Sequence, residues 1–156
     1  MRALRRLVTG GALLAVAGAA TAFTFADGAT MQCLVGGAPV PEIAMQASLP
    51  PAVLRRIALT ERVDSGYRIL WNEGQLKTLP PEMHDFIFFH ECAHASVPTQ
   101  NEVTANCVGL QAMRSAGRAG FAVESKLAAF YGAGSQYWRD TLACANAYKE
   151  APKPPG

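Results

Sequence analysis

The sequence has little charge and no surplus of either sign. Among its 156 residues, 14 are Lys or Arg and 12 are Asp or Glu. Three of the basic residues fall within the first six positions, so the remainder of the chain carries 11 basic and 12 acidic residues. No basic patch is left to attract a nucleic acid or a membrane surface. We therefore expect no nucleic-acid partner.

The sequence also lacks internal repeats, coiled-coil heptads and a glycine-rich phosphate-binding loop. These absences exclude repeat architectures, long coiled coils and nucleotide sites built on such a loop. The chain is long enough for one domain with a core of modest size.

The N-terminal segment has the pattern of a secretory signal peptide. A basic stretch and an alanine-rich apolar run come first, and small residues follow in two pairs, Ala20 with Ala22 and Thr24 with Ala26. This pattern predicts that residues 1–26 are removed on export to the periplasm or the cell exterior. An uncleaved membrane tether is the alternative, because the apolar run covers 20 residues without a charge. Its many Ala, Gly and Thr residues make it a weak membrane span, so we expect no stable insertion after cleavage.

The rest of the chain predicts an α+β domain that is mostly α-helical. Residues 27–50 are rich in Gly, Pro and small side chains and are expected to form an irregular N-terminal arm, tied down by Cys33. The main domain is expected at 51–149, and prolines in the first turn favour a short helix over 50–59. The proline-rich residues 150–156 are expected to form a disordered tail.

A small β-hairpin is expected directly before the most informative helix. Large apolar residues alternate with others over 67–71, the next three residues favour a turn, and 75–79 is a plausible return strand. The helix then opens at Pro81 and stops before Pro98. A second helix is expected from 99 to 117, antiparallel to the first. Two further C-terminal helices are expected at 120–131 and 134–148.

The first helix contains the pattern His-Glu-x-x-His. His90 and His94 lie one turn apart on the same face, with Cβ atoms about 5–6 Å apart, which suits two imidazoles on one Zn²⁺. Glu91 can reach a water at the metal without binding the metal itself. The four residues before His90 are apolar, so the helix is expected to be buried, and buried polar groups need partners. The alternative is a core helix with two satisfied histidines and no metal.

Glu102 is the expected third ligand. A catalytic zinc usually has three protein ligands and an open fourth position. Because the link over 96–101 turns the chain back, Glu102 starts the second helix beside the end of the first, where His94 lies. The alternative is a capping box, in which Glu102 bonds the backbone N–H of Thr99.

Two more residues of the second helix lie on the face that carries Glu102. Asn106 is one turn further on and is expected to hydrogen-bond a ligating histidine. Gly109, another turn along, would let the two helices approach closely.

Four cysteines in an exported chain predict two disulfides. Cys92 points about 200° away from the two histidines on its helix, so it cannot share their metal. In an antiparallel helix pair Cys92 and Cys107 fall at a similar level, which favours Cys92–Cys107 and leaves Cys33–Cys144 to tie the arm to the last helix. Buried free thiols are the alternative.

The two motifs together resemble a known family. His90-Glu-x-x-His94 followed by Asn101-Glu-x-x-Ala-Asn106 is similar to the gluzincin metallopeptidases, of which thermolysin is the best-known member. In that family the second helix carries Asn-Glu-x-x-x-Asp, so Asn106 stands where Asp is frequent. The small size and the hairpin look like the compact minigluzincins. The resemblance covers about residues 67–114 and implies zinc-dependent hydrolysis of peptide bonds in a peptide or protein substrate.

The roles of the residues follow from zinc chemistry. Zn²⁺ lowers the pKa of its water toward about 7 and polarises the scissile carbonyl. Glu91 takes the proton as general base and passes it to the leaving amine. Candidates for stabilising the oxyanion are Tyr67, Tyr131, Tyr137 and His84. The strand at 67–71 is expected to pair with an extended substrate.

Two functions of other classes stay open from the sequence. One is a zinc-binding module that does not hydrolyse its ligand. The other is a disulfide-stapled helical domain that acts through protein contacts without a metal.

Overall fold

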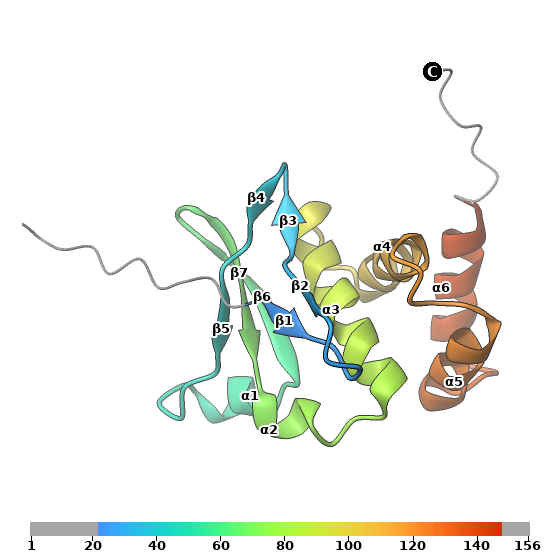
Figure 1. Cartoon of the computed structure of the whole chain (residues 1–156), viewed down its shortest axis with the longest axis horizontal. Coiled ribbons are helices and arrows are strands. Elements are labelled where there is room, and N and C mark those ends of the chain that lie inside the picture. Colours follow the sequence, from blue (N-terminus) through green and yellow to red (C-terminus); the bar gives the residue numbers. More distant parts are fainter. Residues whose placement is uncertain (1–21, 148–156) are drawn as a thin grey trace, which may run out of the picture.

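The computed structural model describes residues 22–147 and has an α+β fold that is mostly helical, as expected (Figure 1). Short strands dominate the first part of the chain and helices the second. The strands are β1 (Phe23–Thr24), β2 (Thr30–Met31), β3 (Leu34–Val35), β4 (Ala38–Pro39), β5 (Glu42–Ala44), β6 (Ala58–Val63) and β7 (Gly66–Trp71). The helices are α1 (Pro51–Leu54), α2 (Glu73–Leu76), α3 (Pro81–Ser96), α4 (Glu102–Ser115), α5 (Phe121–Tyr131) and α6 (Gln136–Ala147).

Helix α3 is the central element, with the strands on one side and the C-terminal helices on the other (Figure 1). It starts at Pro81 behind Pro80, where a missing N–H costs no helical hydrogen bond, and it ends just before Val97. Apolar and polar side chains are buried around most of its circumference, because neighbouring elements contact it from several directions. Both halves of the domain therefore pack on the helix that carries the histidine motif.

A three-stranded sheet contacts α3. Its order is β5-β7-β6, with β5 parallel and β6 antiparallel to β7. The strand predicted at 67–71 is present as β7, but the prediction of the return strand at 75–79 is wrong. The partner strand comes earlier, and the turn between the strands ends at Gly66, whose φ of 128° favours glycine. Asn72 starts α2 instead of a turn, because its Oδ1 accepts a hydrogen bond from the N–H of Gln75.

The helix predicted over 50–59 is confirmed only in its first turn. Helix α1 ends at Leu54, and Ala58 already belongs to β6. Proline sets the start of the helix, but pairing with β7, where Ala58 lies opposite Trp71, decides the later residues.

The N-terminal arm over 27–50 is more regular than its composition predicts. It forms the β3–β4 hairpin, pairs β2 with β1, and supplies β5 to the sheet. Phe23 and Phe25, which lie within the predicted signal peptide at 1–26, are buried in the core. Residues 1–21 and the predicted tail at 150–156 lie outside the described part of the chain.

Two disulfides are present, but both predicted pairings are wrong. Cys33 is joined to Cys92 and Cys107 is joined to Cys144, not Cys92 to Cys107 and Cys33 to Cys144. The histidines of α3 face α4, so Cys92, on the opposite side of the helix, faces the N-terminal strands. Cys107 likewise faces α6. The prediction matched the level of the cysteines along the helix pair and ignored the direction in which they face.

The disulfides indicate that the chain folds in an oxidising, exported environment. Cys33 does tie the arm down, as expected, although its partner is on α3. Within residues 22–147, no helix combines the length and the hydrophobicity that crossing a membrane requires.

Candidate metal centre

His90, His94 and Glu102 come together where the end of α3 meets the start of α4. The Nε2 atoms of the two histidines lie 3.1 Å apart. Oε2 of Glu102 lies 3.1 Å from Nε2 of His90 and 3.7 Å from Nε2 of His94. All three ligand atoms lie within 4.8 Å of one another, so this group could hold a metal ion. The structure thus assembles the three residues that the sequence predicts as ligands.

The other nitrogen of each ring fixes its tautomer. Nδ1 of His90 lies 2.7 Å from Oδ1 of Asn106, and Nδ1 of His94 lies 2.8 Å from the carbonyl oxygen of Thr99. Both oxygens only accept hydrogen bonds, so each Nδ1 must carry its proton. In the neutral rings the two Nε2 lone pairs then face each other and the Glu102 carboxylate. Such an arrangement is repulsive unless a positive charge, either a metal ion or a proton on one Nε2, lies among the three atoms.

The electrostatics of the site favour a cation. Burial alone would lower the pKa of His90, but the hydrogen bond to Glu102 and the negative charges of Glu91 and Glu102 raise it. The hydrogen bond with His90 in turn lowers the pKa of Glu102, and Arg56 adds a smaller effect. Glu102 is therefore held as a carboxylate beside the Nε2 atoms of the two histidines, where a positive charge is favoured.

Glu102 does not cap its helix. The N-cap of α4 is Asn101, whose Oδ1 accepts a hydrogen bond from the N–H of Thr104 at 2.9 Å. Oγ1 of Thr99 accepts from the N–H of Asn101 and takes no part in a capping box with Glu102. Glu102 therefore does not form the capping box, and its carboxylate lies beside the two imidazoles.

Asn106 links α4 to the histidines and to the last helix. It is fully buried, it holds His90 through Nδ1, and its Nδ2 lies 3.5 Å from Oγ1 of Thr141 on α6. A neutral amide fits this position because its oxygen faces the ring and its nitrogen faces a hydroxyl. The residue expected to hydrogen-bond a ligating histidine is therefore in place.

Gly109 allows α3 and α4 to touch. A Cβ at this position would lie 2.9 Å from backbone atoms of Phe89 and His90, closer than real contacts allow. We expect Gly109→Ala to lower the free energy of unfolding by about 1–3 kcal/mol, even though alanine favours helices, because backbone must move. The measurement is chemical denaturation. Gly74→Ala is the matched control, since its Cβ meets only Oδ1 of Asn72 at 3.5 Å, and an equal loss in both variants would contradict the close-contact explanation.

Glu91 is held by a residue that the sequence reasoning missed. Oγ1 of Thr60, on β6, lies 2.7 Å from Oε2 of Glu91 and 2.9 Å from its backbone oxygen. Glu91 is 6% exposed, so this hydroxyl fixes the direction of a largely buried carboxylate. The sequence did not predict the contact of Thr60 with Glu91, because it did not predict a strand at 58–63.

A cleft of about 360 Å³ runs between β6 and the metal-ligand group. The sheet order makes β6 its outer strand, whereas β7 is paired on both sides. The prediction that the strand at 67–71 pairs with a substrate is therefore wrong. Within the described residues, the edge that β6 turns away from β7 carries no further strand. Two arginines, Arg55 and Arg56, also line the cleft.

The backbone groups on the outer edge of β6 follow from the pairing. The N–H of Asn72 donates to the carbonyl of Ile57, while the N–H of Ile69 donates to Pro41, on the β5 side. Bonding directions alternate along antiparallel strands, so the residue opposite Ile69 directs its N–H and C=O away from β7. That residue is Thr60. The edge next to Glu91 is thus a row of backbone donors and acceptors.

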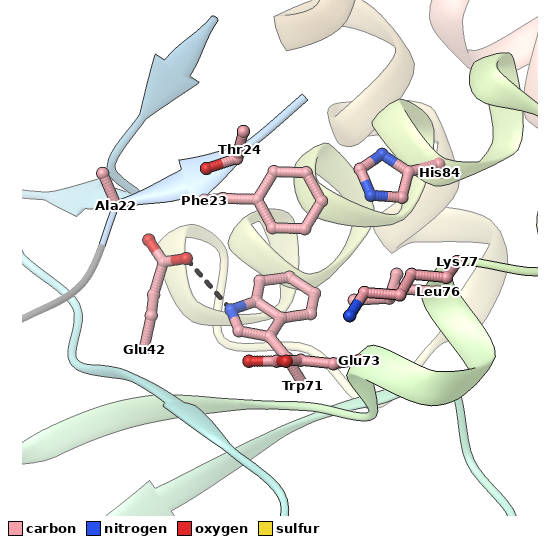
Figure 2. A pocket seen from close by; sticks show the side chains of 9 residues that line it. All are labelled: Ala22, Phe23, Thr24, Glu42, Trp71, Glu73, Leu76, Lys77 and His84. Carbon is pink, nitrogen blue, oxygen red and sulfur yellow. Dashed lines mark hydrogen bonds between the residues drawn. The ribbon is translucent and has the colours of Figure 1, made fainter. Parts of the chain in front are cut away.

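The structure separates the four oxyanion candidates. Tyr67 lies on β7 and packs against the core. His84 lies near the start of α3 and faces a second cavity of about 320 Å³, whose lining includes none of the three metal-ligand residues (Figure 2). Burial raises the pKa of both Tyr131 and Tyr137, and the charge of Glu102 raises them further. The charge of Glu102 therefore acts on both tyrosines, and an interaction with Asn106 has a smaller, lowering effect on the pKa of Tyr137.

Chemically, the arrangement joins a cation-binding group, a positioned carboxylate and an open cleft. These are the parts needed to bind a metal and to move a proton at a bound molecule. Comparison of the chain with descriptions of known protein families, with curated proteins and with solved structures found no match.

Proposed function

We propose that the protein is an exported zinc metallopeptidase of the gluzincin type, which hydrolyses peptide bonds in the periplasm or outside the cell. The observation that supports it most is the set of three converging ligand atoms, with both histidines held by their Nδ1 atoms, next to the directed carboxylate of Glu91. Such a convergence of two imidazoles and a carboxylate at the edge of a cleft favours a metal-binding role over a purely structural one.

Zinc suits this donor set. Two imidazoles and one carboxylate, with a fourth position open to the cleft, are typical of catalytic zinc, and both rings keep the tautomer that leaves Nε2 free. When bound, the ion supplies Lewis acidity, which acidifies water and polarises a carbonyl group. One Zn²⁺ per chain is therefore proposed, held by His90, His94 and Glu102.

The residues of the chain have separate roles in the proposed reaction. Glu91 accepts a proton from the attacking water and delivers it to the leaving amine. Thr60 donates to Oε2 of Glu91 and so orients this carboxylate, which lines the cleft. Tyr137 and Tyr131, whose pKa values the charge of Glu102 raises, are the proposed donors of a hydrogen bond to the oxyanion.

The substrate is proposed to bind as an extended peptide along β6. The outward N–H and C=O of Thr60 would pair with its backbone and bring a peptide bond past Glu91. Edge pairing recognises the backbone and not a particular side chain, so it fits a peptide or protein substrate of varied sequence. Arg55 and Arg56, which line the cleft, would then pair with acidic side chains or with the C-terminal carboxylate of the bound peptide.

Removing and restoring the metal tests this function. We expect a chelator to abolish hydrolysis of a mixed peptide library by the purified protein, and a stoichiometric addition of Zn²⁺ to restore it. Products are read by mass spectrometry. Hydrolysis that continues in the chelator-treated protein, or a zinc-loaded protein that cleaves no peptide of the library, would contradict the proposal.

A further inference from the structure

The first two aromatic residues of the described chain are part of the core. Phe23 is 6% exposed and its ring centroid lies 4.8 Å from that of Trp71 and 5.1 Å from that of Phe88. Phe25 is 3% exposed, and the guanidinium of Arg118 lies 3.8 Å above its ring. Both side chains are therefore part of the core of the domain.

This burial distinguishes the two processing sites that the sequence offers. Cleavage after Ala26 would remove both phenylalanines, β1 and the N–H of Ala26 that donates to Asp85 at 2.9 Å. Cleavage after Ala22 would remove none of them, because Ala22 is exposed and precedes β1. Both sites have small residues at the two positions that a signal peptidase reads.

The start of β1 faces a buried carboxylate. Phe23 lies opposite Met31, and the bond from the N–H of Phe25 to the carbonyl of Ala29 sets the alternation, so the N–H of Phe23 points at β2. Two residues beyond Met31, on the same edge, the N–H of Cys33 does not continue the ladder but donates to Oε1 of Glu42 at 3.2 Å. The carboxylate of Glu42 thus accepts the hydrogen bond that the N–H of Cys33 would donate to β1 if the β1–β2 pairing continued beyond Phe23.

Figure 2 shows the same arrangement from the cavity. Ala22 and Glu42 lie on one wall, and the carboxylate of Glu42, which also accepts from Nε1 of Trp71 at 3.0 Å, points toward the start of β1. Glu42 is 4% exposed. Burial raises the pKa of Glu42, so a positive charge beside it would favour its ionised form.

We propose that the chain is processed by a signal peptidase between Ala22 and Phe23, and that the ammonium group created at Phe23 pairs with Glu42. Hydrolysis breaks one amide bond and consumes one water. The hydroxyl goes to the carbonyl of Ala22, and the nitrogen of Phe23 becomes an amine that is protonated near neutral pH. The ammonium has hydrogens enough for both Met31 and Glu42. This inference is independent of the proposed peptidase activity.

The processing site is tested by exporting the full chain from a bacterial host and measuring the intact mass and the N-terminal sequence of the product. We expect the wild type to begin at Phe23. Ala22→Leu should remain unprocessed, because leucine does not fit the position before the cut, while Ala26→Leu should still begin at Phe23. A product that begins at Asp27, in the wild type or in Ala22→Leu, would overturn the assignment, as would a wild type that stays uncleaved.

The ion pair is tested on the processed protein by acylation of its α-amino group at pH 7. Pairing with Glu42 should raise the pKa of the amine, so Glu42→Gln should be labelled about tenfold faster than the wild type. Glu73→Gln is the matched control, because Glu73 lines the same cavity, and its rate should equal that of the wild type. Equal rates for the wild type and Glu42→Gln would overturn the pairing.

Discussion

Glu91→Gln is expected to lower peptide hydrolysis by at least about 10²–10⁴-fold, the range that a general base contributes, while the protein keeps one zinc ion. Glutamine has nearly the same shape as glutamate, and its oxygen still accepts a hydrogen bond from Thr60, so the fold should not change. What it loses is the ability to take a proton. The measurement combines the rate of peptide cleavage with metal analysis of the same sample.

The control for this variant is Glu73→Gln, which makes the same chemical change in α2, away from the metal centre. It should leave both rate and metal content unchanged. If Glu91→Gln cleaves peptides as fast as the control does, Glu91 is not the general base. If it loses zinc together with activity, its effect is on the metal site and the assigned role is wrong.

Glu102→Ala is expected to weaken zinc binding by more than about 100-fold, because even the outer partners of metal ligands are worth 10–100-fold. The side chain of Glu102 is 57% exposed, so its removal leaves little empty space in the core. Stability in the absence of metal should therefore change little. Zinc affinity is measured by competition with a chelator of known affinity.

The neighbouring residue gives a matched comparison. Asn101→Ala removes the helix cap and should cost about 1 kcal/mol of unfolding free energy, with zinc affinity close to that of the wild type. Glu102→Ala should thus lower zinc affinity with little change in stability, whereas Asn101→Ala should lower stability with little change in zinc affinity. A Glu102→Ala protein that binds zinc like the wild type would show that its carboxylate is not a ligand.

The parts of the site that the sequence predicted depend on short-range geometry. The spacing of His90 and His94 puts them on the same face of any helix. Because the link to Asn101 is short, the second helix must pack antiparallel to the first. Asn106 follows from Glu102 by the same helical spacing. Local rules were sufficient for these residues because none of them needs knowledge of a distant segment.

The parts that the sequence did not predict depend on contacts between distant segments. Thr60 reaches Glu91 only because β6 pairs with β7 and lies along α3, which composition does not reveal. The cysteine partners depended on which side of each helix the rest of the chain would cover. The sequence places Phe23 and Phe25 in the predicted signal peptide. Their burial, with Phe23 packed against Trp71 and Phe88, shows that they belong to the core of the domain.

The metal content of the wild-type protein, purified without chelator, tests the central claim most directly. Native mass spectrometry with elemental analysis should find one zinc ion per chain, and a His90→Ala, His94→Ala double variant should contain none. A folded wild-type protein that holds no metal, and takes none up from added Zn²⁺, would contradict the account.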